Sequence, residues 1–465
     1  MSTTASSGRE AAGPPVDRLT RFAMAIGRLI PDAMTTSIAM VLLVGGAAMA
    51  LGNTIGVVGE AYYKGLWMLL PFTMQMTLIL VLSSTLGAAP VFKRVIARLA
   101  QVPRNDFTFF ALSVGVTAAL SYLYWGLGLA LGPLVAIYFA RAAERRNVSL
   151  DFPFFLATTM AATSVWQFGL SASAPLLMNT PGHFLEKTTG LMPLKTTIWA
   201  PASLLFVGAF LVAIVIAARF LRPTRPQPIS AFPDANHLAE PIAVSGAEPV
   251  VPVVLPEPPS ERLERNPIPT LLLAATLVGW LYYHFAVKQL GLDLNSLNTC
   301  LLLTTLLVHR NVKDFTRALQ AAIVSCWPIV VMYHLYAGVA GLIQFTTVGE
   351  QFAAGFAAVS TRYTFPFLTA LASTVVALFV PSSGGQWAIQ GFVTASAADA
   401  VGVTVQRGLL ALSVGDQMGN LVTPFWAAIG AGMARIDFRR FIGYSMVFAA
   451  IWFVLGVAAF TFLPA

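Results

Sequence analysis

Residues 381–391, PSSGGQWAIQG, place groups that can bind an anion inside an apolar stretch of the chain. The segment begins with the helix breaker Pro381 and continues with two serines and two glycines. Backbone groups freed at such a break have no lipid partner and are tolerated only inside protein or along a wet cavity. Free amide N–H groups there, with the hydroxyls of Ser382 and Ser383, can hold a small anion. A helix kink or a short loop between two spans is the competing interpretation, and the pattern alone leaves both open.

Asp416 is the clearest acidic residue inside a predicted membrane span, where the sequence GDQMGNLVTP interrupts residues 408–429. Acidic residues at such positions usually mark ion or proton paths. Two roles are open for Asp416: a carboxyl group that carries the coupling proton, or a sodium ligand near Gly384 and Asn420. A structural carboxylate satisfied by a neighbouring helix N-terminus is the alternative.

A carboxylate substrate in a membrane cavity needs hydrogen-bond donors rather than a free cation, which is costly to bury. We predict donors from the second hairpin tip and from two broken helices: Ser382, Ser383, Gln386, Asn420, Thr423, Ser171 and Ser173. Each of these side chains has helix capping or back-bonding as a competing role. Trp125 and Trp387 are expected to pack the hairpins, although an alkyl tail also needs an apolar surface. Ordinary packing is favoured for His284, His309 and His334.

The composition indicates a polytopic membrane protein. The 465 residues are 57% hydrophobic and 10% charged, and several apolar runs approach the ~20 residues that a spanning helix needs. The 28 Lys+Arg outnumber the 20 Asp+Glu, but the basic residues lie in short loops, so we expect no nucleic-acid partner. Neither a disulfide framework nor a cleavable signal peptide is expected. The sequence contains no His/Glu metal motif, phosphate loop or nucleophile elbow, so we predict neither an enzyme nor a bound cofactor beyond a coupling ion.

We predict an all-α fold with about nine full spans and two re-entrant helical hairpins. The expected segments are an N-terminus with an interfacial amphipathic helix, a first repeat, a proline-rich cytoplasmic linker without packed structure, a connecting span and a second repeat. Their bounds are residues 1–31, 32–220, 221–269, 270–290 and 291–465. The hairpins are expected at 107–140 and 363–400, and the broken helices at 152–178 and 408–429. Two ordinary short spans remain the alternative to the first hairpin.

The same order of unusual features occurs in both halves, which predicts an internal repeat and a transporter binding site where the halves meet. With the N-terminus in the cytoplasm and each hairpin returning to its own side, only six basic residues lie outside. They are Lys64, Lys187, Lys195, Lys288, Arg362 and Arg407. This bias fits the positive-inside rule, and it makes the two repeats inverted with respect to each other. The count is the same whether a hairpin is re-entrant or consists of two full spans.

The segments FVPSSGGQWAIQG and GDQMGNLVTPFWA, at residues 379–391 and 415–427, resemble the bacterial short-chain fatty acid transporter family of the ion transporter superfamily. RLIPDAMTT near Arg28, WGLGL at Trp125 and GLSASAPL at Gly169 resemble further family segments. The resemblance implies a bacterial inner-membrane carrier for acetoacetate, butyrate or similar acids, with a homodimeric scaffold and an elevator-like mobile domain. The predicted substrate site also includes Gly384, Gly385, Gly126, Gln167 and Trp125.

The chain also departs from the family pattern, with Gln167 and Phe168 where a His-Gly pair is expected, His334 before Tyr336, and Gly419 in place of a threonine. The internal repeat and the family resemblance together predict a cation-coupled secondary transporter of short-chain monocarboxylates. The alternative is a carrier for another small carboxylate or an amino-acid-like solute. An ion channel would need a continuous polar pore, whereas offset broken helices favour alternating access.

Overall fold

The chain folds into a bundle of helices that includes several membrane-spanning ones. The computed structural model describes residues 18–29, 31–238 and 258–463, and among these residues there is no β-strand. Six of the described helices are long and apolar enough to cross a membrane, or seven if one bent pair counts as a single span. The predictions of an all-α fold and of a multi-pass membrane protein are confirmed.

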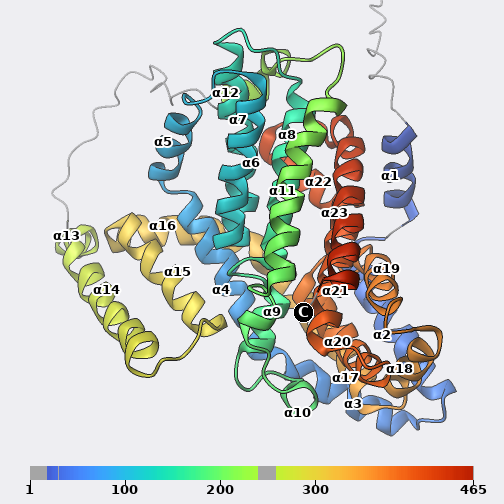
Figure 1. The fold of residues 1–465 in the computed structure, drawn as a ribbon. Helices are drawn as coiled ribbons and strands as arrows, with labels where there is room; N and C mark the ends of the chain where they lie inside the picture. Colours follow the sequence, from blue (N-terminus) through green and yellow to red (C-terminus); the bar gives the residue numbers. More distant parts are fainter. Residues whose placement is uncertain (1–17, 30, 239–257, 464–465) are drawn as a thin grey trace, which may run out of the picture.

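The first half runs from the surface helix α1 to the long apolar helix α11 (Figure 1). Its helices are α1 (Arg18–Leu29), α2 (Ala33–Ala50), α3 (Ile55–Met68), α4 (Leu70–Gly87), α5 (Pro90–Leu99), α6 (Asp106–Leu123), α7 (Trp125–Glu144), α8 (Phe152–Ala161), the 3-10 helix η1 (Ala162–Phe168), α9 (Ser173–Asn179), α10 (Glu186–Thr189), η2 (Leu194–Thr196) and α11 (Pro201–Leu221).

The rest of the chain begins with two short elements and ends with α23. Its helices are η3 (Ile229–Ala231), α12 (Pro233–His237), α13 (Pro259–Arg265), α14 (Pro267–Tyr282), the π-helix η4 (Tyr283–Val287), α15 (Leu294–His309), α16 (Val312–Ile323), η5 (Val324–Cys326), α17 (Trp327–Phe345), α18 (Val348–Val359), α19 (Phe365–Ala377), α20 (Ser383–Ala400), α21 (Val405–Val422), α22 (Pro424–Ala434), η6 (Phe438–Arg440) and α23 (Ile442–Phe462).

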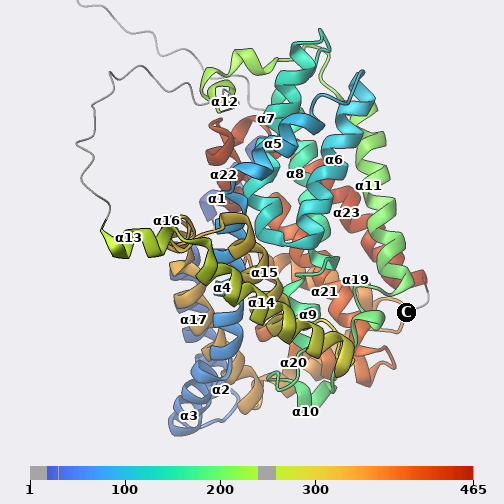
Figure 2. The same ribbon diagram turned by 90° about the vertical axis from the view of Figure 1, so that its left-hand side faces the viewer.

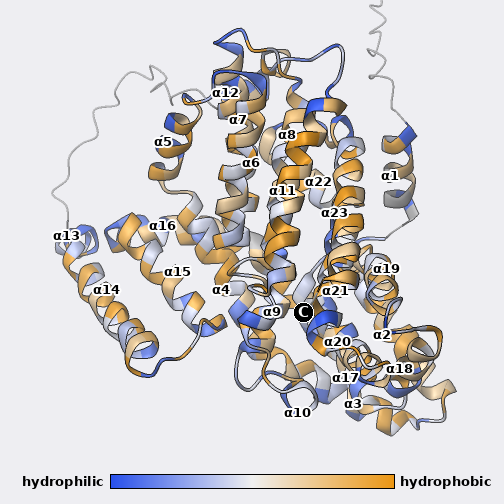
Figure 3. Cartoon of the chain, viewed as in Figure 1, coloured by the Kyte–Doolittle hydropathy of each residue, from blue (hydrophilic) through white to orange (hydrophobic). Residues whose placement is uncertain are grey.

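Local sequence explains where these helices begin. Asn105 and Asp293 form capping boxes before α6 and α15, so backbone donors of the first turn are satisfied by side chains. Proline occupies the first turn of α11 and α22, where its missing N–H costs nothing. Hydrophobic residues cover α11 and α23 along most of their length (Figure 3), as expected of helices that face lipid.

The two halves repeat one order of elements. Each half begins with a helix (α2, α15), a kinked or two-part helix (α3–α4, α16–α17) and a short helix (α5, α18). A hairpin follows in each half (α6–α7, α19–α20). Each half then ends with an interrupted helix (α8–η1–α9, α21–α22) and a long helix (α11, α23). Both arms of the first hairpin are long enough to be spans themselves, the alternative that the sequence left open. In the second hairpin, α19 has 13 residues. An inverted relation between the halves stays a prediction.

The second interrupted helix breaks within the expected segment, but only at the C-terminal end of that segment. The sequence predicts an interruption over residues 415–424, but α21 continues to Val422 and the break is confined to Thr423 and Pro424. Gly415 and Gly419 instead let α21 approach α19 closely, since a Cβ at Gly415 would lie 2.0 Å from the carbonyl oxygen of Ala370. These glycines serve helix packing, and the break lies at the C-terminal end of the predicted segment 415–424.

Part of the proline-rich segment is packed. Ile229 and Ala235 are fully buried, and the amide of Phe152 donates to the carbonyl oxygen of Gln227 at 2.8 Å. The prediction of a linker without packed structure is therefore wrong for residues 222–238, because these two apolar side chains give the segment a surface to bury. Residues 239–257 lie outside the described residues.

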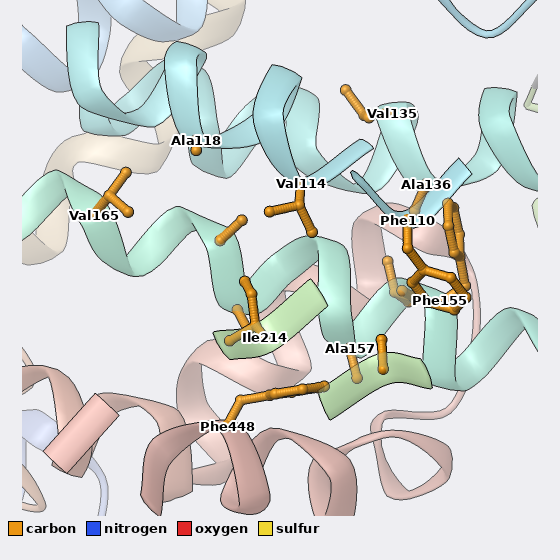
Figure 4. Packing of buried hydrophobic residues seen from close by; sticks show 14 of the residues in the cluster. Phe110, Val114, Ala118, Val135, Ala136, Phe155, Ala157, Val165, Ile214 and Phe448 are labelled. Atoms are coloured by element: carbon orange, nitrogen blue, oxygen red, sulfur yellow. The ribbon is translucent and has the colours of Figure 1, made fainter. Parts of the chain in front are cut away.

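The largest apolar cluster holds the first hairpin and the first interrupted helix together. Figure 4 shows Phe110 of α6 beside Phe155 of α8, whose ring centroids are 5.0 Å apart, with Phe448 of α23 nearby. Phe168 at the end of η1 stacks on Phe460 at 5.6 Å, so α23 also supports this element. The break after η1 is thus fixed against well-packed neighbours. In two views at right angles, α14 and α15 lie outside this group, beside α4 (Figure 2).

Candidate functional site

Three helix N-termini meet at one cavity. Trp125 is the first residue of α7, Ser173 the first of α9 and Ser383 the first of α20, and all three line this cavity. The first turn of a helix presents backbone N–H groups without intrahelical partners and a positive dipole end. The interrupted elements of both halves therefore direct anion-binding groups to a common place.

The cavity has a volume of about 180 Å³ and a mostly apolar wall. Its apolar and aromatic lining is Met76, Trp125, Leu129, Met160, Trp166, Ile329, Met332, Tyr333, Tyr336, Leu421 and Trp426. The polar side chains that reach it are Thr163, Ser173, Ser382, Ser383, Gln417, Asn420 and Ser445. Among the described residues of this lining there is no Lys, Arg or His, so an anion bound here would rely on neutral donors, as predicted.

The two serines of the second hairpin have different environments. Ser382 caps α20, with its Oγ 3.4 Å from the amide of Gly385 and 2.6 Å from the hydroxyl of Tyr333 on α17. Ser383 is 1% exposed, and its Oγ has no hydrogen-bond partner within the described part of the chain. A buried hydroxyl without a partner is costly, so Ser383 presents a donor that is free for a ligand.

Asp416 is fully buried and lies at a contact between the two halves. One oxygen, Oδ2, accepts hydrogen bonds from Nε2 of Gln167 on η1 and from Nδ2 of Asn420, the latter at 3.1 Å. The other oxygen, Oδ1, has no partner among the described residues, and the same is true of Oε1 of Gln167. The structure thus brings together the predicted residues Gln167, Asp416 and Asn420. In the alternative interpretation of Asp416 a helix N-terminus would satisfy its carboxylate, but the observed partners are the side-chain amides of Gln167 and Asn420.

Gln417 belongs to the site but was not predicted. It accepts a hydrogen bond from Nε1 of Trp166 at 3.0 Å and donates one to Oγ of Ser164 at 3.0 Å, and it lines the cavity. A signal existed in the sequence, because Gln417 precedes Asn420 by three residues and so shares its helix face. Trp426 on α22 completes the network by donating to Oδ1 of Asn420 at 3.1 Å.

Several predicted residues support the cavity without lining it. Nε2 of Gln386 donates to the backbone and hydroxyl of Ser373 on α19, both at 2.7 Å, so it joins the two arms of the hairpin. Oγ of Ser171 accepts from the amide of Trp125 at 2.8 Å and caps α7. Thr423 bonds to the carbonyl oxygen of Asn420 at 3.2 Å. The bonds of Ser171 and Thr423 are the capping and back-bonding roles that the sequence left as alternatives.

The predicted glycines permit close packing around the cavity. A Cβ at Gly384 would lie 2.3 Å from Phe72 and 3.3 Å from Ser173, and one at Gly385 would lie 2.8 Å from the ring of Tyr336. At Gly126 the added atom would be 2.6 Å from Cβ of Ser83. Phe72 also stacks on Tyr333 at 5.6 Å. The hairpin tip therefore sits directly on aromatic side chains of α4 and α17.

A comparison with known protein families identifies the family of this chain. The model of the family described as "Short chain fatty acid transporter" matches residues 16–462. The chain belongs to this family. Membership confirms the resemblance seen in the motifs and identifies a transporter rather than an enzyme.

Two bacterial relatives are similar to this chain over nearly their whole length. A protein of Escherichia coli (strain K12), provisionally named a short-chain fatty acid transporter, is 29% identical over 447 residues, covering 95% of this chain and 98% of the relative. A protein of Haemophilus influenzae with the same provisional name is 25% identical and is covered to 99%.

The solved structure of one transporter, MtrF, shares the fold of this chain at low sequence identity. MtrF of Neisseria gonorrhoeae, described with a class of antimetabolite efflux pumps, has a TM-score of 0.57 and 14% identity, with 96% of this chain and 97% of MtrF covered. The YdaH transporter of Alcanivorax borkumensis has a TM-score of 0.47 and 15% identity, with 95% and 98% covered. The likeness to MtrF concerns the fold alone.

Proposed function

We propose that the chain carries short-chain monocarboxylates of the acetoacetate and butyrate class across the bacterial inner membrane, driven by a proton or sodium gradient. The observation that carries this proposal is the cavity itself, in which neutral donors stand at the starts of interrupted helices and the rest of the wall is apolar. A short fatty acid has the matching division into one carboxylate and one alkyl tail.

In this proposal the carboxylate binds at the N-terminus of α20. The unpartnered hydroxyl of Ser383 and the first-turn amides donate to it, with Asn420 on the opposite side. The tail rests on Met76, Met160 and Ile329. A volume of about 180 Å³ suits a solute of a few heavy atoms, since drug-sized ligands occupy pockets of roughly 300 Å³ or more.

Alternating access would arise from movement between two groups of helices. Met76, Ile329 and Tyr333 come from α4 and α17, whereas Trp125, Ser383 and Asn420 come from the hairpins and interrupted helices. A substrate held between the groups is exposed to one side or the other as they move, which is the elevator-type mechanism. We propose α2–α4 and α14–α17 as a static, dimeric scaffold.

Asp416 is the proposed coupling residue, because its Oδ1 is buried without a partner and its Oδ2 is held by Gln167 and Asn420. Either a proton or a sodium ion would satisfy the free oxygen, and both roles remain part of the proposal.

The decisive experiment is uptake of radiolabelled butyrate and acetoacetate into proteoliposomes under a proton or a sodium gradient, each imposed alone. We expect saturable uptake under one gradient. Folded protein that moves an α-amino acid but neither fatty acid would favour the amino-acid-like alternative and contradict the substrate assignment.

Asp416→Asn tests the coupling role. Because the amide carries no charge and binds no proton, gradient-driven accumulation should fall at least tenfold, while exchange of labelled for unlabelled butyrate continues. Asp437→Asn, a change at the exposed start of η6, is the matched control. Full accumulation by the Asp416 variant would refute the role.

A further inference from the structure

A second cavity, of about 310 Å³, lies between α5 and the α7 arm of the first hairpin. Its lining is Lys93, Arg94, Ala97, Gln101, Tyr138, Arg141, Ala142 and Arg145, and it shares no residue with the cavity proposed for transport. The predicted topology places it at the cytoplasmic end of the protein, where the positive-inside count concentrates basic residues.

The charge of this cavity has one sign. Four basic side chains line it, and no lining residue is acidic. Carboxylates near it in the chain are engaged elsewhere: Asp106 pairs with Arg222, and Glu144 accepts a hydrogen bond from Ser230. Lys93, Arg94 and Arg145 bring three positive charges to one space, and an anion bound between them would relieve their mutual repulsion. The electrostatics therefore favour a ligand with negative charge.

The backbone at this cavity is held in place. The guanidinium group of Arg146, at the end of α7, donates to the carbonyl oxygens of Gln101 and Pro103, which follow α5. On the other side of α5, Ile96 is buried against the bundle. The spacing between the two basic helices is thus fixed by contacts that do not involve the four lining cations.

The outer surface of α5 carries exposed apolar side chains as well as basic ones. Val91 and Val95 are 37% and 45% exposed, although they lie within one turn of Lys93 and Arg94. A helix that combines exposed apolar side chains with basic ones lies at a membrane surface. Acyl chains can cover the valines while a head group enters the basic cavity, and a soluble anion would leave the valines uncovered.

We propose that this cavity binds the phosphate group of an anionic phospholipid and that the bound lipid ties α5 to the first hairpin. Basic pockets between membrane helices on the cytoplasmic side suit such head groups. Since α5 connects α4 to α6, the lipid would bridge the proposed scaffold and the mobile hairpin.

The test uses the purified full-length protein, stripped of lipid in detergent, with binding followed by native mass spectrometry and by the melting temperature. The probes are phosphatidylglycerol, phosphatidylcholine and inorganic phosphate. Arg94→Gln/Arg145→Gln removes two charges from the cavity. Arg98→Gln/Arg104→Gln removes two charges from the same region, outside the lining, and is the matched control.

We expect phosphatidylglycerol to bind and to raise the melting temperature, phosphatidylcholine to do neither, and the cavity variant to bind about 30-fold more weakly. The control variant should bind like the unchanged protein. An equal loss of phosphatidylglycerol binding in both variants would mean that the lipid is attracted to the basic surface in general, and this would overturn the proposed site. If inorganic phosphate raised the melting temperature as much as phosphatidylglycerol does, a lipid would not be the ligand of this cavity. If phosphatidylglycerol did not bind, the proposal would be overturned.

Discussion

At the scale of single residues, Tyr333 connects two parts of the protein that the proposed mechanism separates. Its hydroxyl bonds to Ser382 at 2.6 Å, while its ring stacks on Phe72. Ser382 is also the cap of α20, so one hydrogen bond links the start of the hairpin arm to α17.

Tyr333→Phe should raise the KM for butyrate uptake about three- to tenfold and reduce the free energy of unfolding by about 1 kcal/mol, because a single buried hydrogen bond is lost. Ser382→Ala should have a similar effect. The double variant should be no worse than Ser382→Ala alone, since both changes remove the same bond. Strictly additive effects of the two substitutions would show that the residues act independently.

The sequence identified individual residues of the site, but it did not identify which of them contact each other. Ser382, Ser383 and Asp416 were identifiable because polar groups and a proline stand inside apolar runs. The hydrogen bond between Gln167 and Asp416 was not identifiable, because 249 positions separate the two residues and only the packed fold brings them together. The hydrogen bond between Tyr333 and Ser382 was also missed, because an aromatic residue in an apolar helix gives no sign of which neighbour it faces.

At the scale of elements, glycines set how closely the hairpins approach their neighbours. The hairpin bounds were predictable, because proline and glycine disfavour a continuous helix at residues 381–385. The exact position of the break after α21 was not predictable, because a glycine permits close helix packing as readily as it permits a kink. Gly415 and Gly384 look alike in sequence, yet one lies inside a continuous helix and the other at a helix start.

Gly384→Ala should lower the maximal uptake rate, because the added Cβ would lie 2.3 Å from Cζ of Phe72 and the hairpin tip would be displaced. Overpacking of this kind costs about 1–3 kcal/mol. Gly432→Ala on α22 is the control, as nothing lies within 4 Å of the added atom. The second-site change Phe72→Leu should restore part of the rate, and failure to do so would exclude this steric explanation.

The loop around α10 should respond to pH through His183. Burial lowers the pKa of this imidazole below 6.5, and its Nδ1 accepts a hydrogen bond from the amide of Leu185 at 3.3 Å. Because the folded pKa lies below the unfolded one, the loop's stability is complete above pH 6.5 and is lost as the pH falls through the folded pKa.

Hydrogen exchange at the Leu185 amide, corrected for intrinsic rates, measures this effect. Protection should fall between neutral pH and about pH 5. In His183→Asn, whose side-chain oxygen can accept the same bond without titrating, protection should not depend on pH. Unchanged protection of the original protein in acid would contradict this role of His183.

At the scale of the whole molecule, α12 and α10 lie at opposite ends in both views (Figures 1 and 2). The positive-inside count assigns the α12 end to the cytoplasm, and α12 packs against α7. The basic cavity beside α7 and the loop of His183 should therefore face different compartments.

Single cysteines can test this orientation in a Cys300→Ala/Cys326→Ala background. Ser149→Cys, after α7, should react with an impermeant maleimide only in inside-out vesicles. Thr188→Cys, in α10, should react only in right-side-out vesicles, and both positions are exposed. The reverse pattern would invert the topology, and reaction of both from one side would exclude it.

The contact between Gln167 and Asp416 also bears on how the protein is made. At a synthesis rate of roughly 5–20 residues per second, the ribosome needs on the order of tens of seconds to add the 249 positions between them. During that interval the first interrupted helix is in the membrane without the polar partners that its Gln167, Trp166 and Ser164 bond in the finished protein. The nascent first half must therefore be shielded by the insertion machinery or by water until α21 arrives.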